Sequence, residues 1–146
     1  MLFRSAYNNL GHGAQMYTVW TGAFLAMSAI LYVDDTDLLH RAKLSTTTIE
    51  EFHDAVQMAV MDWGRLVQAT GGALKPDKCF YYLMDFKWIN GKAYMKTKSK
   101  LPSTPMLIPQ PEGPDVEIPL LEVTHAKKTL GVKGCPAGTE IGRAHV

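Results

Sequence analysis

The sequence has little of what marks disulfide-rich, secreted or membrane proteins. It contains only two cysteines, Cys79 and Cys135, which lie far apart and lack the CxxC spacing of zinc sites and redox motifs. No apolar run reaches the roughly eighteen residues of a membrane span, and the first residues lack the basic and then apolar pattern of a secretory signal. We therefore expect two structural thiols and an intracellular protein, cytoplasmic or nuclear, with no membrane partner.

Acidic residues are absent before Asp34 and then gather in one segment. Residues 34–62 contain seven acids against two basic residues, whereas residues 75–100 contain seven lysines against two acids. Such a separation can hold a cation beside a polyanion, or it can reflect two solvated faces of a domain. The 146 residues, with 47% hydrophobic and 20% charged positions, suit one folded domain.

The pattern before residue 40 predicts two strands and a hairpin. β-branched and aromatic residues predict strands at residues 16–20 and 24–33. Asp34 and Asp35 interrupt the second apolar run, so we expect both carboxylates at the tip of a hairpin.

The next segment predicts a helix over residues 47–69. Thr47 and Thr48 each precede a glutamate by three residues, so either can begin a capping box. Apolar residues follow at spacings of three and four, and Gly71-Gly72 predicts the end. Trp63 is the largest residue of this stripe, and we expect it in the core.

The pattern after the helix is less regular. Aromatic residues predict a strand at residues 79–88, and Asn90-Gly91 predicts a hairpin turn with a return strand at residues 93–98. Six prolines predict an extended connection over residues 102–119. Further short strands are expected at residues 116–123 and 129–132.

The paired carboxylates Asp34 and Asp35 suit a hard cation. Magnesium prefers oxygen ligands and is typically held by one or two carboxylates plus substrate phosphates. Because adjacent strand residues point to opposite faces, we expect one of the two to bind the metal directly. The alternative is that Asp34-Asp35 is only a turn.

The order of two motifs carries a family resemblance. Tyr32-Val33-Asp34-Asp35 lies in a hydrophobic hairpin, a helix follows, and Gly71-Gly72-Ala73-Leu74-Lys75-Pro76-Asp77-Lys78-Cys79 comes next. This arrangement closely resembles the palm of reverse transcriptases, of the non-LTR or a related retroelement type. The likeness extends over residues 11–138 and includes residues 80–88 and 128–132.

The resemblance implies two-metal nucleotidyl transfer. It assigns Asp34 and Asp35 as the catalytic carboxylates that hold Mg²⁺, or Mn²⁺ in its place. It assigns Lys78 as the general acid for the leaving pyrophosphate, with Lys75 as the alternative. A solvated surface lysine is the other interpretation of Lys78.

The resemblance also implies contacts to substrates. Tyr32 and Val33 would lie beside the primer end and the incoming deoxynucleoside triphosphate. Lys75, Lys87 and Lys92 would face the phosphates of an RNA or DNA template-primer. Alternatively, the lysines of the hairpin prevent strand pairing at a solvated edge.

One departure from the family bears on activity. Polymerase palms carry another metal-binding aspartate on an earlier strand, and this sequence has no acid before Asp34. Residues 1–5 and 140–146 each resemble translated sequencing adapter, so we expect residues 6–139 to be a partial reverse transcriptase domain. The remaining polymerase chain would then be a partner, and the isolated chain would be inactive.

We therefore expect an α+β fold, in which an antiparallel sheet packs against the helix at residues 47–69 as the C-terminal part of a polymerase palm. The first alternative is a small nucleic-acid-binding module that uses the lysine-rich hairpin without polymerase chemistry. The second is a structural domain in which Asp34-Asp35 is only a turn.

Overall fold

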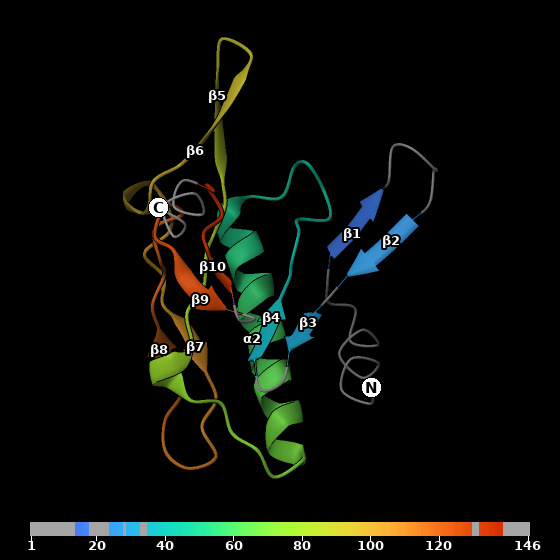
Figure 1. Ribbon diagram of the computed structural model, residues 1–146, viewed down its shortest axis with the longest axis vertical. Coiled ribbons are helices and arrows are strands. Elements are labelled where there is room, and N and C mark those ends of the chain that lie inside the picture. The colour runs from blue at the N-terminus through green and yellow to red at the C-terminus, as the bar shows by residue number, and fades with distance from the viewer. Residues whose placement is uncertain (1–13, 18–23, 28, 33–34, 130–131, 139–146) are drawn as a thin grey trace.

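The computed structural model describes residues 14–17, 24–27, 29–32, 35–129 and 132–138, and there the chain is a mixture of one long helix and short antiparallel strand pairs (Figure 1). The helices are α2 (Ile49–Ala69) and the 3-10 turns η1 (Pro76–Lys78) and η2 (Lys98–Lys100). The strands are β1 (Ala14–Tyr17), β2 (Phe24–Met27), β3 (Ala29–Tyr32), β4 (Asp35–Leu38), β5 (Phe86–Ile89), β6 (Lys92–Met95), β7 (Met106–Ile108), β8 (Val116–Ile118), β9 (Lys127–Thr129) and β10 (Val132–Gly134). No helix in this part of the chain is long and apolar enough to cross a bilayer.

The ends of α2 follow from local sequence. Thr48 is the N-cap: its hydroxyl accepts a hydrogen bond from the Glu51 amide at 3.2 Å, and the Glu51 carboxylate accepts one from the Thr48 amide at 2.9 Å. Of the two predicted capping boxes, the second is therefore the one formed. After Ala69, Gly71 adopts a φ of 82°, which favours glycine. The predicted helix is confirmed.

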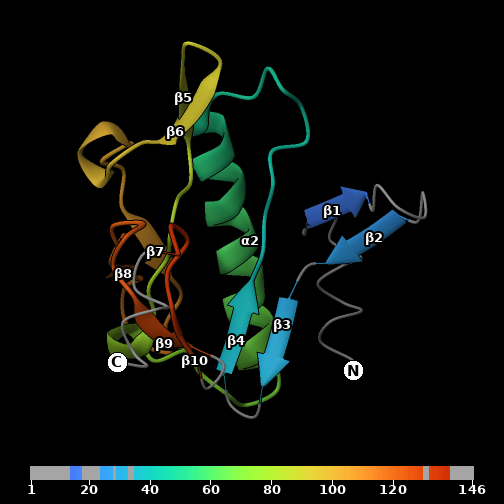
Figure 2. The same cartoon turned by 45° about the horizontal axis from the view of Figure 1, so that its top comes forward.

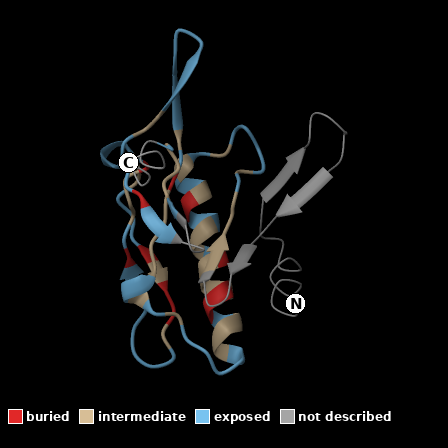
Figure 3. Cartoon of the chain, viewed as in Figure 1, coloured by how far each residue is buried: buried red, intermediate tan, exposed pale blue. Residues whose placement is uncertain are grey.

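One apolar cluster joins α2 to the first half of the chain. Ala59 and Trp63 are buried on α2, with Trp63 only 6% exposed, and Leu38 at the end of β4 packs against them. In Figure 3, buried positions recur along α2. The expected core position of Trp63 is confirmed.

A second cluster joins the same helix to the second half of the chain. Met106 and Ile108 of β7 are each 1% exposed, and they pack with Ile118 of β8. Val56 and Val60 of α2 lie against this cluster. Because both clusters share α2, the helix is the common support for β4 and for the β7–β8 pair.

Two further contacts hold β7 close to α2. The Gln57 side-chain amide donates to the Leu107 carbonyl at 2.8 Å, and its oxygen accepts from the Leu107 amide at 2.7 Å. Gly64 is buried beside Pro109, where a Cβ on Gly64 would lie 2.3 Å from the proline Cγ. Gln57 thus makes the two hydrogen bonds with Leu107 that a neighbouring strand would otherwise make. Gly64, which has no side chain, permits Pro109 to lie close to α2.

The hairpin β5–β6 projects from the remaining structure (Figures 1 and 2). Asn90 and Gly91 have φ values of 49° and 75°, as the predicted tight turn requires. An ion pair between Asp85 and Lys96 joins the two strands at the base. This hairpin is confirmed, although its strands are shorter than predicted.

The structure corrects the predicted strand at residues 79–88. Only β5, at its end, has strand pairing, and before it Tyr81 forms a single parallel bridge with Leu120. The Tyr81 amide donates to the Pro119 carbonyl at 3.1 Å, and the Leu121 amide donates to the Tyr81 carbonyl at 2.9 Å. Before β5, this segment therefore contributes one bridging residue and not a strand.

The sheet architecture also differs from the prediction. The α+β class is confirmed, but in the described ranges the strands form five separate two-stranded sheets and not one sheet. The prolines predict only an extended connection over residues 102–119, but this segment includes β7, which forms part of the core. In place of one strand at residues 129–132, the structure has the two strands β9 and β10. Near the start of the chain, β1 overlaps the first predicted strand, and the second predicted strand is divided into β2 and β3.

Candidate functional site

The predicted metal-binding hairpin corresponds to β3–β4. The two strands are antiparallel, and Tyr32 pairs with Asp35 as the last pair before the connection. Val33 and Asp34 lie between these residues in the sequence and outside the described residues. The expected hairpin is thus present in its described part, with Tyr32 and Asp35 opposite each other.

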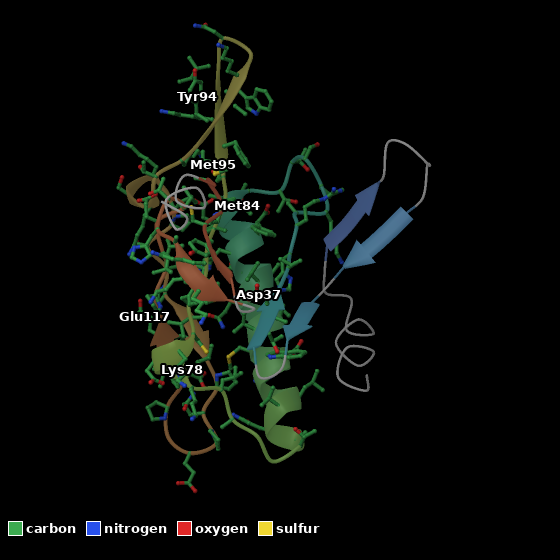
Figure 4. The ribbon with its side chains drawn as sticks, in the orientation of Figure 1. Asp37, Lys78, Met84, Tyr94, Met95 and Glu117 are labelled. Carbon is green, nitrogen blue, oxygen red and sulfur yellow. The ribbon has the colours of Figure 1, made fainter. Side chains whose placement is uncertain are left out.

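The helix α2 fixes β4 directly after the acidic pair. Leu38 packs against Trp63 and Ala59, and it lies three residues after Asp35. Side chains alternate along a strand, so the half-buried Asp37 lies on the face of β4 opposite to Leu38 (Figure 4). A strand held by a tryptophan-centred cluster provides a rigid support for carboxylates at its start.

The metal prediction depends on Asp34 and Asp35. Among the described residues, no three histidine, cysteine or acidic side chains are grouped so that they could hold a metal ion. Carboxylate oxygens are the ligands that magnesium prefers, so the chemistry of Asp34 and Asp35 suits this ion. Magnesium binding stays a prediction.

The predicted general acid lies on another part of the molecule. Lys78 is exposed at the end of η1, and its amide donates to the Lys75 carbonyl at 3.0 Å. Figure 4 shows Lys78 on η1, which contacts β8. In Figures 1 and 2, β3 and β4 lie on one side of the molecule, and the β7–β8 pair lies on the other side. The structure therefore separates Lys75 and Lys78 from the hairpin with which the resemblance associates them.

Two titratable groups next to η1 are kept in their neutral forms. Burial raises the pKa of the Cys79 thiol, and the negative charge of Asp77 raises this pKa further. Burial likewise raises the pKa of the Tyr81 hydroxyl, with Glu117 as the second cause. A protonated, half-buried Cys79 fits the structural thiol that we expected.

Two of the lysines predicted to bind nucleic acid, Lys87 and Lys92, lie on β5–β6. The cross-strand pairs are Phe86 with Met95, Lys87 with Tyr94, Trp88 with Ala93, and Ile89 with Lys92. Alternation therefore places Lys87, Lys92 and Tyr94 on one face, and Trp88 on the other. Lys87 and Lys92 are exposed, and among the described residues no acidic side chain pairs with either.

The sequence predicts a binding role for lysines of this hairpin but not for its aromatic residues. Trp88 is 72% exposed and Tyr94 is 46% exposed, although such side chains are usually buried. The sequence carried no clear signal of this exposure, because it predicted longer strands at residues 79–88 and 93–98. The structure has two strands of four residues, and such a hairpin cannot bury both faces without a third strand. Exposed aromatic rings among lysines are suited to stacking on bases and to contacting phosphates.

Comparisons with known proteins identify no relative. No protein-family model matches the chain, and no curated protein or solved structure is significantly similar to it. The functional assignment therefore depends on the motifs and on the geometry described above.

Proposed function

We propose that this chain is part of the palm of an RNA-directed DNA polymerase from a non-LTR or related retroelement, and that β3–β4 is its catalytic hairpin. The observation that supports this most directly is the pairing of Tyr32 with Asp35 at the end of an antiparallel hairpin held by α2. Bound magnesium, or manganese, would activate the primer 3′-hydroxyl and neutralise the leaving pyrophosphate. Asp34 and Asp35 would hold the metal.

The other predicted residues have supporting roles in this proposal. Tyr32 and Val33 would contact the primer end and the nucleotide. The ammonium group of Lys78 donates a proton to the pyrophosphate when the bond between the α-phosphorus and the leaving oxygen breaks. Because η1 and β3–β4 occupy different flanks, this step requires η1 to approach the hairpin when substrate binds.

The test compares two proteins, the 146-residue chain and the complete polymerase that contains it. The complete enzyme should extend a primer on an RNA template in magnesium, whereas the chain alone should not. Asp34→Asn in the complete enzyme should lower nucleotide incorporation by more than about 100-fold, because it removes several kcal/mol of charge stabilisation. Asp35→Asn should lower incorporation less.

A matched control comes from the same strand. Asp37→Asn makes the same chemical change on β4 but affects no predicted metal ligand, so it should retain most incorporation. Circular dichroism would establish that each variant is folded. Substantial incorporation by a folded Asp34→Asn enzyme, or primer extension by the chain alone, would contradict the proposal.

The projecting hairpin favours a second candidate function. Exposed Trp88 and Tyr94 among Lys87 and Lys92 suit a nucleic-acid-binding module that lacks polymerase chemistry. Paramagnetic Mn²⁺ distinguishes the two functions in the chain as it stands. With a deoxynucleoside triphosphate present, Mn²⁺ should broaden the amide NMR signals of β4, and Asp34→Asn should remove that effect. Salt-dependent nucleic-acid binding without such broadening would favour the module.

A further inference from the structure

The acidic and the basic parts of the sequence also lie apart in the folded chain. Residues 86–111 contain no acid and include the hairpin β5–β6, whereas Glu50, Glu51 and Asp54 are exposed on the first turns of α2. In Figures 1 and 2 the hairpin projects beyond the end of the molecule at which α2 begins. Among the described residues, no lysine or arginine forms an ion pair with these three acids. Each charged surface is therefore open to a partner of opposite charge.

The acids of α2 share the exposed side of the helix with an apolar side chain. Glu50, Asp54 and Met58 are spaced four residues apart, so they form one row along the helix, which we call the outer row. All three are exposed, and Met58 is 66% exposed although methionine is usually buried. The outer row thus combines two negative charges with one apolar side chain.

The hairpin β5–β6 has a face of complementary character. Lys87 is paired with Tyr94 and Ile89 with Lys92, and alternation places all four on one face, which we call the lysine face. All four are exposed, Ile89 by 47% and Tyr94 by 46%. Trp88 lies on the opposite face. The lysine face thus combines two positive charges with two apolar side chains.

The dimensions of the two surfaces match. A strand of four residues extends about 13 Å, and the rise along α2 from Glu50 to Met58 is about 12 Å. When the lysine face lies along the outer row, each lysine can approach a carboxylate while the two apolar side chains cover Met58. Because the hairpin extends beyond its own α2, the helix that it can reach belongs to a second copy of the chain.

Two-fold symmetry makes this contact twice. Both surfaces belong to one chain, so each hairpin can lie on the α2 of the other copy around one axis, and the assembly is closed. A stable interface needs about 800 Å² on each partner, and the face of one two-stranded hairpin about 13 Å long is smaller than this. The doubled contact brings both the hairpin and the helix of each copy into the interface.

We infer that the chain forms a two-fold symmetric dimer in which the lysine face of each β5–β6 hairpin docks on the outer row of α2 in the other copy. The two lysines pair with Glu50 and Asp54, and the two apolar side chains pack on Met58. The charge pairs set the orientation and are weakened by salt, and the apolar contacts exclude water from them.

The dimer goes beyond the proposed function and adds a regulation to it. Lys87 and Lys92 are also the lysines predicted to face the phosphates of a template-primer. The dimer covers them, so a polyanion competes with the second copy for the same face. This competition rests on the proposed function, whereas the dimer itself does not.

The first experiment measures the mass of the 146-residue chain by sedimentation equilibrium over a range of concentrations. The wild type should form a concentration-dependent dimer that weakens as salt rises. Lys87→Glu with Lys92→Glu, and separately Glu50→Lys with Asp54→Lys, place like charges at the contact. Each pair of changes should raise the Kd of the dimer by more than about 100-fold. A wild type that is monomeric up to millimolar concentration overturns the inference.

Mixing the two charge-reversed variants gives the sharper result. In a mixed dimer each wild-type surface meets a wild-type surface and each reversed surface meets a reversed one. The mixed dimer should therefore form with an affinity near that of the wild type, although neither variant dimerises alone. Circular dichroism would establish that each variant is folded. Failure of two folded variants to associate on mixing overturns the inference.

A milder variant serves if a reversed variant does not fold. Lys87→Gln with Lys92→Gln only removes the two charges, so it should raise the Kd of the dimer by a smaller factor. An unchanged Kd in this variant contradicts the dimer.

Two controls locate the contact. Glu112→Lys with Asp115→Lys makes the same change of charge on the exposed connection between β7 and β8, and Trp88→Ala changes the other face of the hairpin. Both should dimerise as the wild type does. Loss of the dimer in Trp88→Ala, with a dimer retained when both lysines are reversed, would place the contact on the other face and overturn the inference.

A competition separates the dimer from the proposed function. A short RNA–DNA duplex added to the wild-type dimer should yield monomers bound to the duplex. A dimer that binds the duplex and persists would contradict phosphate binding by Lys87 and Lys92 and leave the dimer intact. A monomeric wild type that binds the duplex overturns the dimer and leaves the proposed function intact. The Asp34→Asn assay tests the catalytic assignment independently of both.

Discussion

Two tryptophans divide the molecule into regions of different character. Trp63 on α2 is 6% exposed and belongs to the cluster against which Leu38 of β4 packs, whereas Trp88 on β5 is 72% exposed on a projecting hairpin. The same side chain thus stabilises the fold in one region and is available to a partner in the other. Burial, and not residue type, therefore distinguishes the core of this molecule from its proposed binding surface.

The largest effect on stability is expected at Trp63. Trp63→Ala removes the largest side chain of the cluster that joins α2 to Leu38, and it leaves a cavity. The free energy of unfolding should fall by about 3–5 kcal/mol, which urea denaturation would measure. Trp63→Phe, which retains an aromatic ring, should lower the free energy of unfolding by a smaller amount. A change near zero for Trp63→Ala would show that this region is not the core.

A smaller effect is expected where α2 meets β7. Gln57→Leu leaves the amide and the carbonyl of Leu107 without their partners, which should cost about 1–3 kcal/mol. Gln68→Leu is the matched control on the same helix, because the buried Gln68 amide nitrogen has no hydrogen-bond partner among the residues that the structure describes. That change should be neutral or stabilising. Equal losses in the two variants would mean that the Gln57 contacts contribute nothing specific.

The close approach of α2 to Pro109 gives the next prediction. An alanine at Gly64 would place its Cβ 2.3 Å from the proline Cγ, and a proline ring cannot move aside freely. Overpacking of this kind costs about 1–3 kcal/mol. The helix propensity of alanine offsets about 1 kcal/mol of this cost, so Gly64→Ala should destabilise the chain by up to about 2 kcal/mol. Ala55→Gly, at an exposed position of α2, measures the propensity effect alone. A stabilising Gly64→Ala would indicate a looser contact in solution.

The sequence predicted the elements whose signals are local. The capping threonine, the apolar spacing around Trp63 and the Asn90-Gly91 turn each act over a few residues, and the corresponding helix and hairpin are present. The strand β7 was missed because its burial depends on contacts with α2 about fifty residues earlier in the chain, including that of Gln57. The pattern of residues within the proline-rich segment cannot predict a contact with a helix so far away in the sequence.

The candidate site was predicted unevenly for the same reason. The antiparallel pairing of Tyr32 with Asp35 follows from an apolar run interrupted by acids. The distance between Lys78 and that hairpin could not be predicted, because it depends on how η1 packs against β8 after the helix. The order of two motifs along a sequence therefore does not determine how close their residues lie in the folded chain.

The smallest effect on stability is expected at Trp88. This residue also gives the most direct test of the difference between Trp63 and Trp88. Its cross-strand partner is Ala93, and most of the ring is exposed, so Trp88→Ala should change the free energy of unfolding by no more than about 0.5 kcal/mol. The same change should weaken binding of single-stranded nucleic acid by about 1–3 kcal/mol, the range for one stacked base. Thermal melting and fluorescence anisotropy on the same samples would measure both quantities, with Trp88→Phe as the control that preserves a ring.

Trp63 and Trp88 would then show opposite profiles, one affecting unfolding and the other affecting binding. A loss of stability at Trp88 as large as that at Trp63 would mean that the hairpin packs against another part of the chain in solution, and the division of the molecule into support and binding surface would fail.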